Sequence, residues 1–242
     1  MIKKHKSTVL CCAFHPTNGQ LLATGSSDFK CRVFSTFSTD VDGSNVDAGP
    51  FGKPVEFGET YLELSSSGWV NSVAWSPTGR VLAFASQDST VSFVTFTENG
   101  NQISQKLKLK DLPFNKILFI SERALVGVGH DFNPTIISET MGKWSVHRKL
   151  DEKVDSISDT SGGGNNSVAA ARALFVSKSS RGQDAAKESD GLWTKHESAI
   201  SSICNASPNK EKRITKISTS SADGRVIVWD LNSIPDLSKL LI

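Results

Sequence analysis

The sequence predicts an all-β protein in which one unit of strands and turns recurs along the chain. Three observations favour this fold class: the apolar runs are short and β-type, turn-forming residues separate them, and one strand–turn pattern repeats. The fifteen expected strands lie near residues 8–14, 21–26, 30–37, 57–64, 69–75, 81–86, 90–96, 103–109, 115–120, 123–128, 134–140, 143–149, 199–205, 213–220 and 224–230. The one helix-forming run, residues 167–176, lies in an insert between two of these strands, so an all-β fold follows.

Length and composition bound the number of domains and the kinds of partner. A chain of 242 residues with 38% hydrophobic residues can bury one sizeable core. The formal net charge of +2 is too small for a whole-molecule field, so we expect no nucleic-acid partner. No apolar run is long enough for a spanning helix and no signal-peptide pattern opens the chain, so we expect no membrane insertion. The four cysteines contain no CxxC pair, which favours a reducing, intracellular compartment.

The repeated unit is an apolar strand ending in an aromatic residue, a polar residue and a proline. It occurs at residues 9–16 and again at 70–77, each time followed by a turn ending in glycine and a second apolar strand. A turn aspartate then follows, at Asp28, Asp88, Asp131 and Asp223. The spacing from residue 88 to residue 131 matches the roughly 40–45 residues of a WD-type repeat, and the longer spacings indicate insertions.

The last repeat carries a polar set that can cross a sheet without leaving donors unpaired. His196 can donate to Asp223 and accept from Thr219, whose hydroxyl can in turn accept the indole N–H of Trp229. These residues, followed by Asp230, predict a WD-type repeat.

The first repeat retains part of this set. His5, Thr24 and Asp28 fit, but Phe34 stands where the tryptophan belongs, so the network should lack its last donor. The third repeat keeps little beyond its turn acid. We expect the whole set to be structural.

The predicted organisation is a single partial propeller domain over residues 1–242. Its expected parts are a blade at 5–64 with a loop insert at 38–56, blades at 69–109 and 115–149, a flexible insert at 151–195, and a last blade with a C-terminal tail at 196–242.

Catalysis finds no support in the sequence. The adjacent His130 and Asp131 lack a second ligand pair at a sensible spacing, so a turn is the better interpretation than a metal site. No phosphate-binding loop, nucleophile elbow or zinc-protease motif occurs. Cys11 and Cys12 lie in an expected strand and are interpreted as small apolar residues. We therefore expect no catalytic residue, no cofactor and no bound metal.

Several segments together resemble the WD-repeat subunit family of the actin-related protein 2/3 complex. Residues 28–37 carry the most specific likeness, because they include Phe34 at the position where a WD repeat usually has tryptophan. The other segments that carry it are residues 4–10, 15–16, 21–24, 57–59, 69–77 and 125–131.

The resemblance implies about four blades of a seven-bladed β-propeller. Roughly three N-terminal blades of the family pattern are then missing, which is expected of a fragment or a short gene product. Fifteen strands are one short of four complete blades, so the last blade should lack its outer strand. An independently closed four-bladed ring is the alternative.

The resemblance also implies a function without catalysis. Members of the family are structural and regulatory subunits that contact the other subunits, the mother actin filament and nucleation-promoting factors, in the cytoplasm and the actin-rich cortex. A generic WD-repeat scaffold in another assembly, such as a substrate receptor or a coat, is the main alternative. An enzyme housed on a propeller is the third.

By position, the projecting helix of the family matches residues 168–178. The expected partner-binding residues are Val168, Arg172, Leu174, Phe175 and Lys178. The other interpretation is a solvated loop that folds back on its own propeller.

Overall fold

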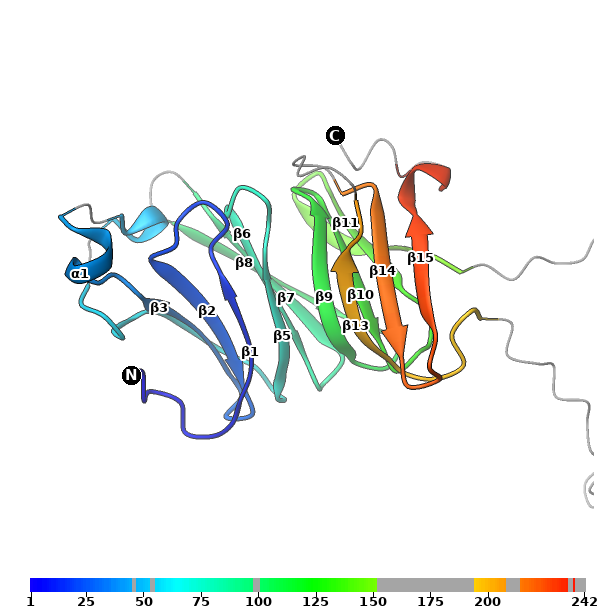
Figure 1. Cartoon of the computed structure of the whole chain (residues 1–242), viewed down its shortest axis with the longest axis horizontal. Helices are drawn as coiled ribbons and strands as arrows, with labels where there is room; N and C mark the ends of the chain where they lie inside the picture. The colour runs from blue at the N-terminus through cyan, green and yellow to red at the C-terminus, as the bar shows by residue number, and fades with distance from the viewer. Residues whose placement is uncertain are drawn as a thin grey trace, which may run out of the picture. The chain divides into compact units, whose positions relative to one another are not determined.

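The computed structural model describes residues 1–44, 47–52, 55–97, 101–151, 194–207, 214–234 and 237. Its contacts separate residues 152–194 from the unit formed by Met1–Asp151 and Lys195–Ile242, and every element below belongs to that second unit. The described residues form four antiparallel sheets, each with its strands in chain order (Figure 1).

Each sheet is a meander of consecutive strands. The first sheet consists of β1 (Val9–Phe14), β2 (Leu21–Ser26), β3 (Lys30–Ser35) and β4 (Thr60–Ser65). The second consists of β5 (Val70–Trp75), β6 (Val81–Ser86), β7 (Thr90–Phe96) and β8 (Gln102–Lys108). The third consists of β9 (Phe114–Ser121), β10 (Ala124–Gly129), β11 (Thr135–Thr140) and β12 (Lys143–Lys149). The fourth has β13 (Ile200–Asn205), β14 (Lys216–Ser221) and β15 (Val226–Asp230).

The turn after the second strand of every sheet has the same backbone form. The residue that follows the turn aspartate has a positive φ in all four sheets: Phe29 (66°), Ser89 (57°), Phe132 (62°) and Gly224 (80°). At Phe29, Ser89 and Gly224 the backbone N–H also closes the turn onto the carbonyl three residues earlier. A type I turn followed by a left-handed residue joins antiparallel strands in this way. The repeat in the sequence is thus a repeat in backbone geometry.

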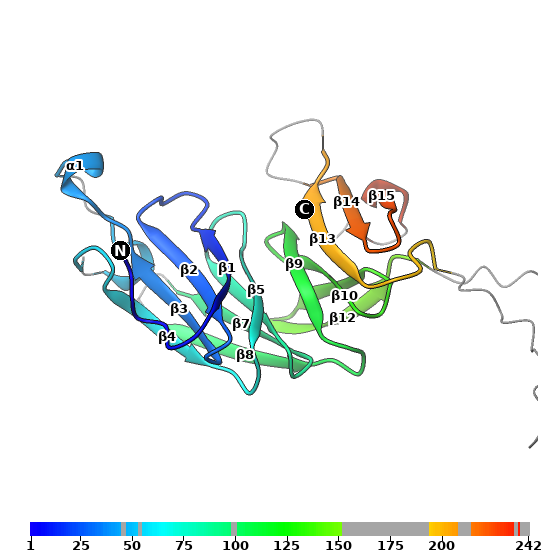
Figure 2. The same ribbon diagram turned by 60° about the horizontal axis from the view of Figure 1, so that its bottom comes forward.

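The sheets contact one another through their first strands: β1 contacts β5, β5 contacts β9, and β9 contacts β13 (Figure 2). Two asparagines at matching positions tie them together. The amide nitrogen of Asn71 on β5 donates to the carbonyl of Phe114 at 3.2 Å, and that of Asn115 on β9 donates to the carbonyl of Ile200 at 3.2 Å. The strands β5 and β9 are therefore each hydrogen-bonded to the first residue of the first strand in the next sheet.

Three apolar clusters fill the spaces between neighbouring sheets. Between the second and third sheets, Phe93 stacks on Trp144 with ring centroids 4.1 Å apart. Between the first and second, His15 meets Trp75 edge-on, and its Nε2 donates to the carbonyl of Gly79 at 3.2 Å. Gly79 has a φ of 78°, and a Cβ there would lie 1.8 Å from His15 Nε2, so this seam requires glycine.

The expected loop at residues 38–56 contains two short helices, which corrects the sequence interpretation. Helix α1 spans Thr39–Asp42, and the 3₁₀ helix η1 spans Gly49–Phe51. Pro50 lies at the start of η1, where its fixed φ suits the first helical turn. Phe51 then stacks on Tyr61 at 4.8 Å, so packing on the first sheet holds η1 in place.

The strands lie within a few residues of the expected ranges, and the all-β fold class is confirmed. The fourth sheet has three strands in the described part of the chain. A third short helix, η2, spans Leu231–Ser233 after β15. The helix expected at 168–178 lies outside the described residues.

Candidate functional site

The fourth sheet brings together the four polar-network residues predicted from the last repeat. Trp229 on β15 donates its indole N–H to the hydroxyl of Thr219 on β14 at 2.8 Å. His196 Nε2 lies 2.8 Å from the same hydroxyl, and His196 Nδ1 lies 3.4 Å from a carboxylate oxygen of Asp223. The donors therefore run from Trp229 through Thr219 and His196 to Asp223.

Asp223 also organises the turn that it occupies. Its carboxylate accepts the backbone N–H of Glu197 at 2.7 Å and that of Arg225 at 2.8 Å. Burial opposes ionisation, but hydrogen bonds from Ser221 and from these two backbone groups outweigh it and hold the pKa of Asp223 well below its usual range. The ionised carboxylate thus accepts hydrogen bonds from two segments, and it links the residues before β13 to the turn between β14 and β15.

The first sheet also brings its predicted residues together, with the hydrogen bonds running the other way. His5 Nε2 lies 2.7 Å from the hydroxyl of Thr24, and His5 Nδ1 lies 3.2 Å from Asp28. Arg32 donates to His5 Nδ1 at 2.6 Å, which makes Nδ1 an acceptor and leaves Nε2 to donate to Thr24. Thr24 then donates to the backbone carbonyl of Arg32 at 3.4 Å. Phe34 contributes no donor and meets the His5 ring edge-on at 5.8 Å.

Arg32 is the central member of the first-sheet network, and it was missed in the sequence. Its side chain is only 6% exposed, and it donates to Asp28 at 2.7 Å and to Glu63 on β4 at 2.8 Å. Burial would raise the pKa of Asp28, but hydrogen bonds from the backbone N–H of Lys6 and from Arg32 lower it strongly. No local pattern marks Arg32 in the sequence, because an arginine in a strand is expected to be exposed.

The second and third sheets lack the full network. Ser66 occupies the histidine position of the second sheet, and its hydroxyl donates to Ser86 at 2.6 Å. In the third sheet Asp131 accepts the backbone N–H of Leu112 at 3.2 Å. Burial beside Asp111 raises the pKa of Asp131 above its usual value. His130 and Asp131 thus lie at a turn, and the described residues contain no cluster of three His, Cys, Asp or Glu side chains that could hold a metal ion.

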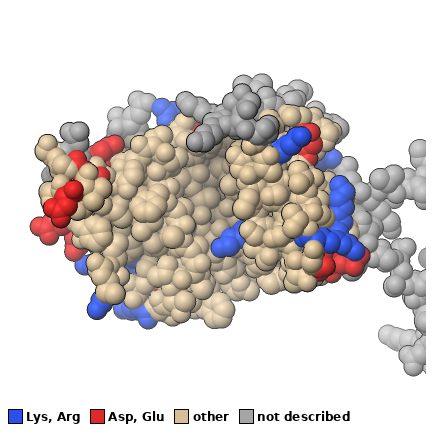
Figure 3. Space-filling model, in the orientation of Figure 1, with Lys and Arg blue, Asp and Glu red and all other residues tan. Residues whose placement is uncertain are grey.

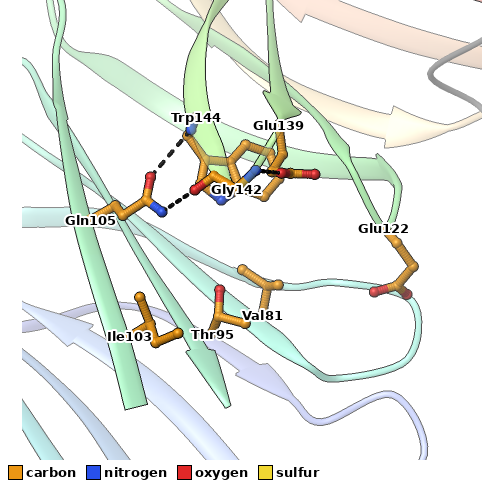
Figure 4. A pocket seen from close by; sticks show the side chains of 8 residues that line it. All are labelled: Val81, Thr95, Ile103, Gln105, Glu122, Glu139, Gly142 and Trp144. Carbon is orange, nitrogen blue, oxygen red and sulfur yellow. Dashed lines mark hydrogen bonds between the residues drawn. The ribbon is translucent and has the colours of Figure 1, made fainter. Parts of the chain in front are cut away.

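A hollow between the second and third sheets is bridged by hydrogen bonds (Figure 4). Eight residues line it: Val81, Thr95, Ile103, Gln105, Glu122, Glu139, Gly142 and Trp144. The Gln105 side chain accepts from the backbone N–H of Trp144 at 3.2 Å and donates to the carbonyl of Gly142. Glu139 accepts from Gly142 and, at 2.8 Å, from Arg123. Because Gln105 and Glu139 already form hydrogen bonds with protein groups, we interpret this hollow as part of the packing between the two sheets.

One face of the described sheets carries few charges. In Figure 3 the middle of that face shows few acidic or basic side chains, and these gather towards its two ends. Large apolar side chains are exposed on four of the described strands: Val9, Leu10 and Phe14 on β1, Ile103 on β8, Val146 on β12, and Val226 and Val228 on β15. Cys12 on β1 is exposed too, whereas Cys11 packs against the cluster between the first and second sheets.

The partner-binding residues expected in the insert, Val168, Arg172, Leu174, Phe175 and Lys178, lie outside the described residues. Within the described ranges, no helix combines the length and apolar character needed to cross a membrane.

Three stretches of the chain match the family described as WD domain, G-beta repeat: residues 1–35, 58–94 and 189–230. The first contains β1–β3, the second β4–β6 and most of β7, and the third β13–β15. Together with the four meander sheets and the His–Thr–Asp–Trp network, these matches define a WD-repeat protein with a partial β-propeller fold.

The relatives make the assignment more specific. The chain is 39% identical to actin-related protein 2/3 complex subunit 1A of Arabidopsis thaliana, over 96% of this chain and 60% of that protein. It is 34% identical to subunit 1A-B of Xenopus laevis, over 96% of this chain and 60% of that protein. It is 31% identical to subunit 1 of Schizosaccharomyces pombe, over 93% of this chain and 62% of that protein. The chain is thus homologous to subunit 1 of the actin-related protein 2/3 complex, as the resemblance implies, and spans about 60% of the length of these relatives.

Proposed function

We propose that this chain is a non-catalytic structural and regulatory subunit of an actin-related protein 2/3 complex, where it supports the nucleation of branched actin filaments. The observation that carries the proposal is identity of 31% to 39% with proteins named as subunit 1 of that complex, over nearly the whole of this chain. On this proposal its partners are the other subunits of the complex, and its place is the cytoplasm and the actin-rich cortex.

The chemistry of the buried polar groups supports a scaffold. In the first and fourth sheets the histidines, aspartates and threonines that a hydrolase could use bind one another. His5 hydrogen-bonds through both ring nitrogens, and His196 bonds Thr219 through Nε2 while its Nδ1 lies 3.4 Å from Asp223, so each imidazole links a strand to a turn. Groups committed to holding strands are poor candidates for proton transfer to a substrate.

The contacts with the mother filament and with nucleation-promoting factors are proposed on the sequence of the insert. From residue 160 to residue 183 the chain has no acidic residue, while Arg172, Lys178 and Arg181 are basic. Val168 and Phe175 would share one face of a helix with residue 171. A short apolar face with a basic rim suits an acidic partner surface such as actin or an activator tail.

The subunit proposal is tested by affinity capture of the tagged chain from its own cells, with quantitative mass spectrometry of the captured proteins. Actin-related proteins 2 and 3 should dominate the captured set. A set dominated by another assembly, such as a receptor or coat, would instead identify a generic WD-repeat scaffold and end the proposal.

The insert is tested separately, within the assembled complex. The double variant Arg172→Glu, Phe175→Ala should weaken filament or activator binding, more visibly at low salt, without a change in the thermal midpoint. Lys187→Glu, a charge reversal elsewhere in the insert, is the matched control. Wild-type binding and branching by the double variant would make residues 168–178 a linker only.

A further inference from the structure

Asp28 and Asp88 occupy the same turn position in the first and second sheets, but their surroundings differ. Four residues after Asp28 stands Arg32, whose guanidinium donates to the carboxylate at 2.7 Å. Four residues after Asp88 stands Ser92, which is buried and too short to do the same. The two positions are equivalent in register. Arg32 pairs with Thr24, four residues before Asp28, and Ser92 pairs with Phe84, four residues before Asp88.

The other partner of the turn aspartate is missing as well. His5 stands four residues before the first strand of its sheet and lies 3.2 Å from Asp28. Ser66 takes the corresponding position before β5, and its hydroxyl is engaged with Ser86. Serine therefore takes the positions around Asp88 that Arg32 and His5 occupy around Asp28.

These replacements leave a buried acceptor beside a polar cavity. The Oδ1 atom of Asp88 is buried and has no hydrogen-bond partner among the described residues. Asp88, Ser66 and Ser92 line a cavity of about 280 Å³, together with Thr90, Lys106 and Lys108. A buried carboxylate oxygen without a hydrogen-bond donor is unfavourable, so the site favours a ligand that supplies a donor. The cavity is large enough for a guanidinium group, which is the group that fills this position in the first sheet.

A second, apolar hollow adjoins the cavity at Asp88. Phe29 and Trp69 line it and are 45% and 52% exposed, which is a large exposed fraction for aromatic side chains. An aromatic face next to a carboxylate attracts a cation with an apolar stem, through cation–π attraction and charge pairing.

We propose that Phe29, Ser66, Trp69, Asp88 and Ser92 form a socket for an arginine side chain of a partner protein. The guanidinium enters the cavity and donates to Asp88, as Arg32 does to Asp28, and the stem and neighbouring apolar residues of the partner lie on Trp69 and Phe29. This inference does not depend on the proposed function, because it names the chemistry of the partner and not the assembly.

The two lysines at the cavity do not convert it into an anion site. The ammonium of Lys108 donates to the backbone carbonyl of Asp88, and Lys106 lies on the exposed side of β8. An anion between them would stand beside the buried carboxylate, where repulsion is strong. Lys106 does oppose a guanidinium, so Lys106→Ala should tighten arginine binding.

The probe is the capped tripeptide Ac-Leu-Arg-Leu-NH₂, titrated into the full chain and followed by the amide resonances of residues 66–69 and 87–92. The matched peptide carries citrulline, which has the same shape without the charge. The arginine peptide should shift these resonances and bind at least tenfold more tightly than the citrulline peptide. Asp88→Asn should lower its affinity at least tenfold, whereas Asp131→Asn, at the same turn position of the third sheet, should leave it unchanged.

A second variant protects the test against misfolding. Ser66→His with Ser92→Arg rebuilds the surroundings of Asp28 around Asp88, so it should raise the thermal midpoint and abolish binding of the arginine peptide. Equal affinity for arginine and citrulline, absence of shifts at these residues, or preferential binding of the acidic peptide Ac-Leu-Glu-Leu-NH₂ would each overturn the proposal.

Discussion

Thr219 and Trp229 are joined by a hydrogen bond of 2.8 Å from the indole N–H to the threonine hydroxyl, and both side chains are buried. The hydroxyl is shared with His196, which continues the chain of donors to the turn aspartate. A tryptophan at this position therefore fixes the direction of the side-chain hydrogen bonds that run from Trp229 through Thr219 to His196.

Trp229→Phe should destabilise the chain by about 1–3 kcal/mol, because it removes the donor and leaves a buried acceptor unsatisfied. Urea unfolding measures the effect, with Trp69→Phe as the exposed control. An unchanged unfolding midpoint for Trp229→Phe would mean that the network is not formed.

The two histidines should differ in tautomer. In the first sheet Arg32 donates to His5 Nδ1, so the proton of neutral His5 belongs on Nε2. In the fourth sheet Thr219 accepts from Trp229 and donates to His196 Nε2, so the proton of His196 belongs on Nδ1. Long-range ¹H–¹⁵N correlation spectra at pH 8 distinguish these forms. The same tautomer for both residues would contradict the reversal.

Arg32→Met should cost about 3–5 kcal/mol, because it leaves the Asp28 carboxylate buried without its cation. Arg225→Met is the matched control, since the ion pair of Arg225 with Glu197 is exposed and such pairs contribute about 0–1 kcal/mol. If the two variants unfold at the same urea concentration, the buried pair does not hold the first sheet.

His15 should make stability depend on pH. Burial in the seam with Trp75 and Gly79 lowers the pKa of His15 below its usual 6.5. The unfolded chain therefore takes up the proton first, so stability is full above about pH 7 and falls as the pH drops below about 6.5. His15→Gln keeps a donor for Gly79 but does not titrate, so its urea midpoint should change less between pH 7.5 and pH 5.5. Parallel pH profiles for the two proteins would refute this role.

The strands could be predicted because each apolar run is short and ends at a residue with turn chemistry, such as Asp28 or Gly79. The fourth-sheet network could also be predicted, since His196, Thr219, Asp223 and Trp229 are residue types whose donors and acceptors match. Both predictions depend on local pattern alone.

Arg32 and the socket at Asp88 could not be predicted in this way. An arginine in a strand is expected to be exposed, and its burial depends on Glu63, which only the pairing of β3 with β4 brings near. Ser66 and Ser92 belong to no recognisable sequence motif. Their role becomes clear only when the structure shows that they stand where the first sheet has His5 and Arg32. The helices α1 and η1 were missed because they are only four and three residues long, and η1 also depends on the packing of Phe51 on Tyr61.

Reconstitution of the complex tests the central claim of this account most directly. The tagged chain is co-expressed with the remaining subunits of an actin-related protein 2/3 complex that lacks its own subunit 1, and the eluate is analysed by size-exclusion chromatography with mass detection. The account predicts that the chain elutes with actin-related proteins 2 and 3 in a one-to-one ratio. Elution of the chain alone, with the other subunits assembled or scattered without it, would contradict the claim.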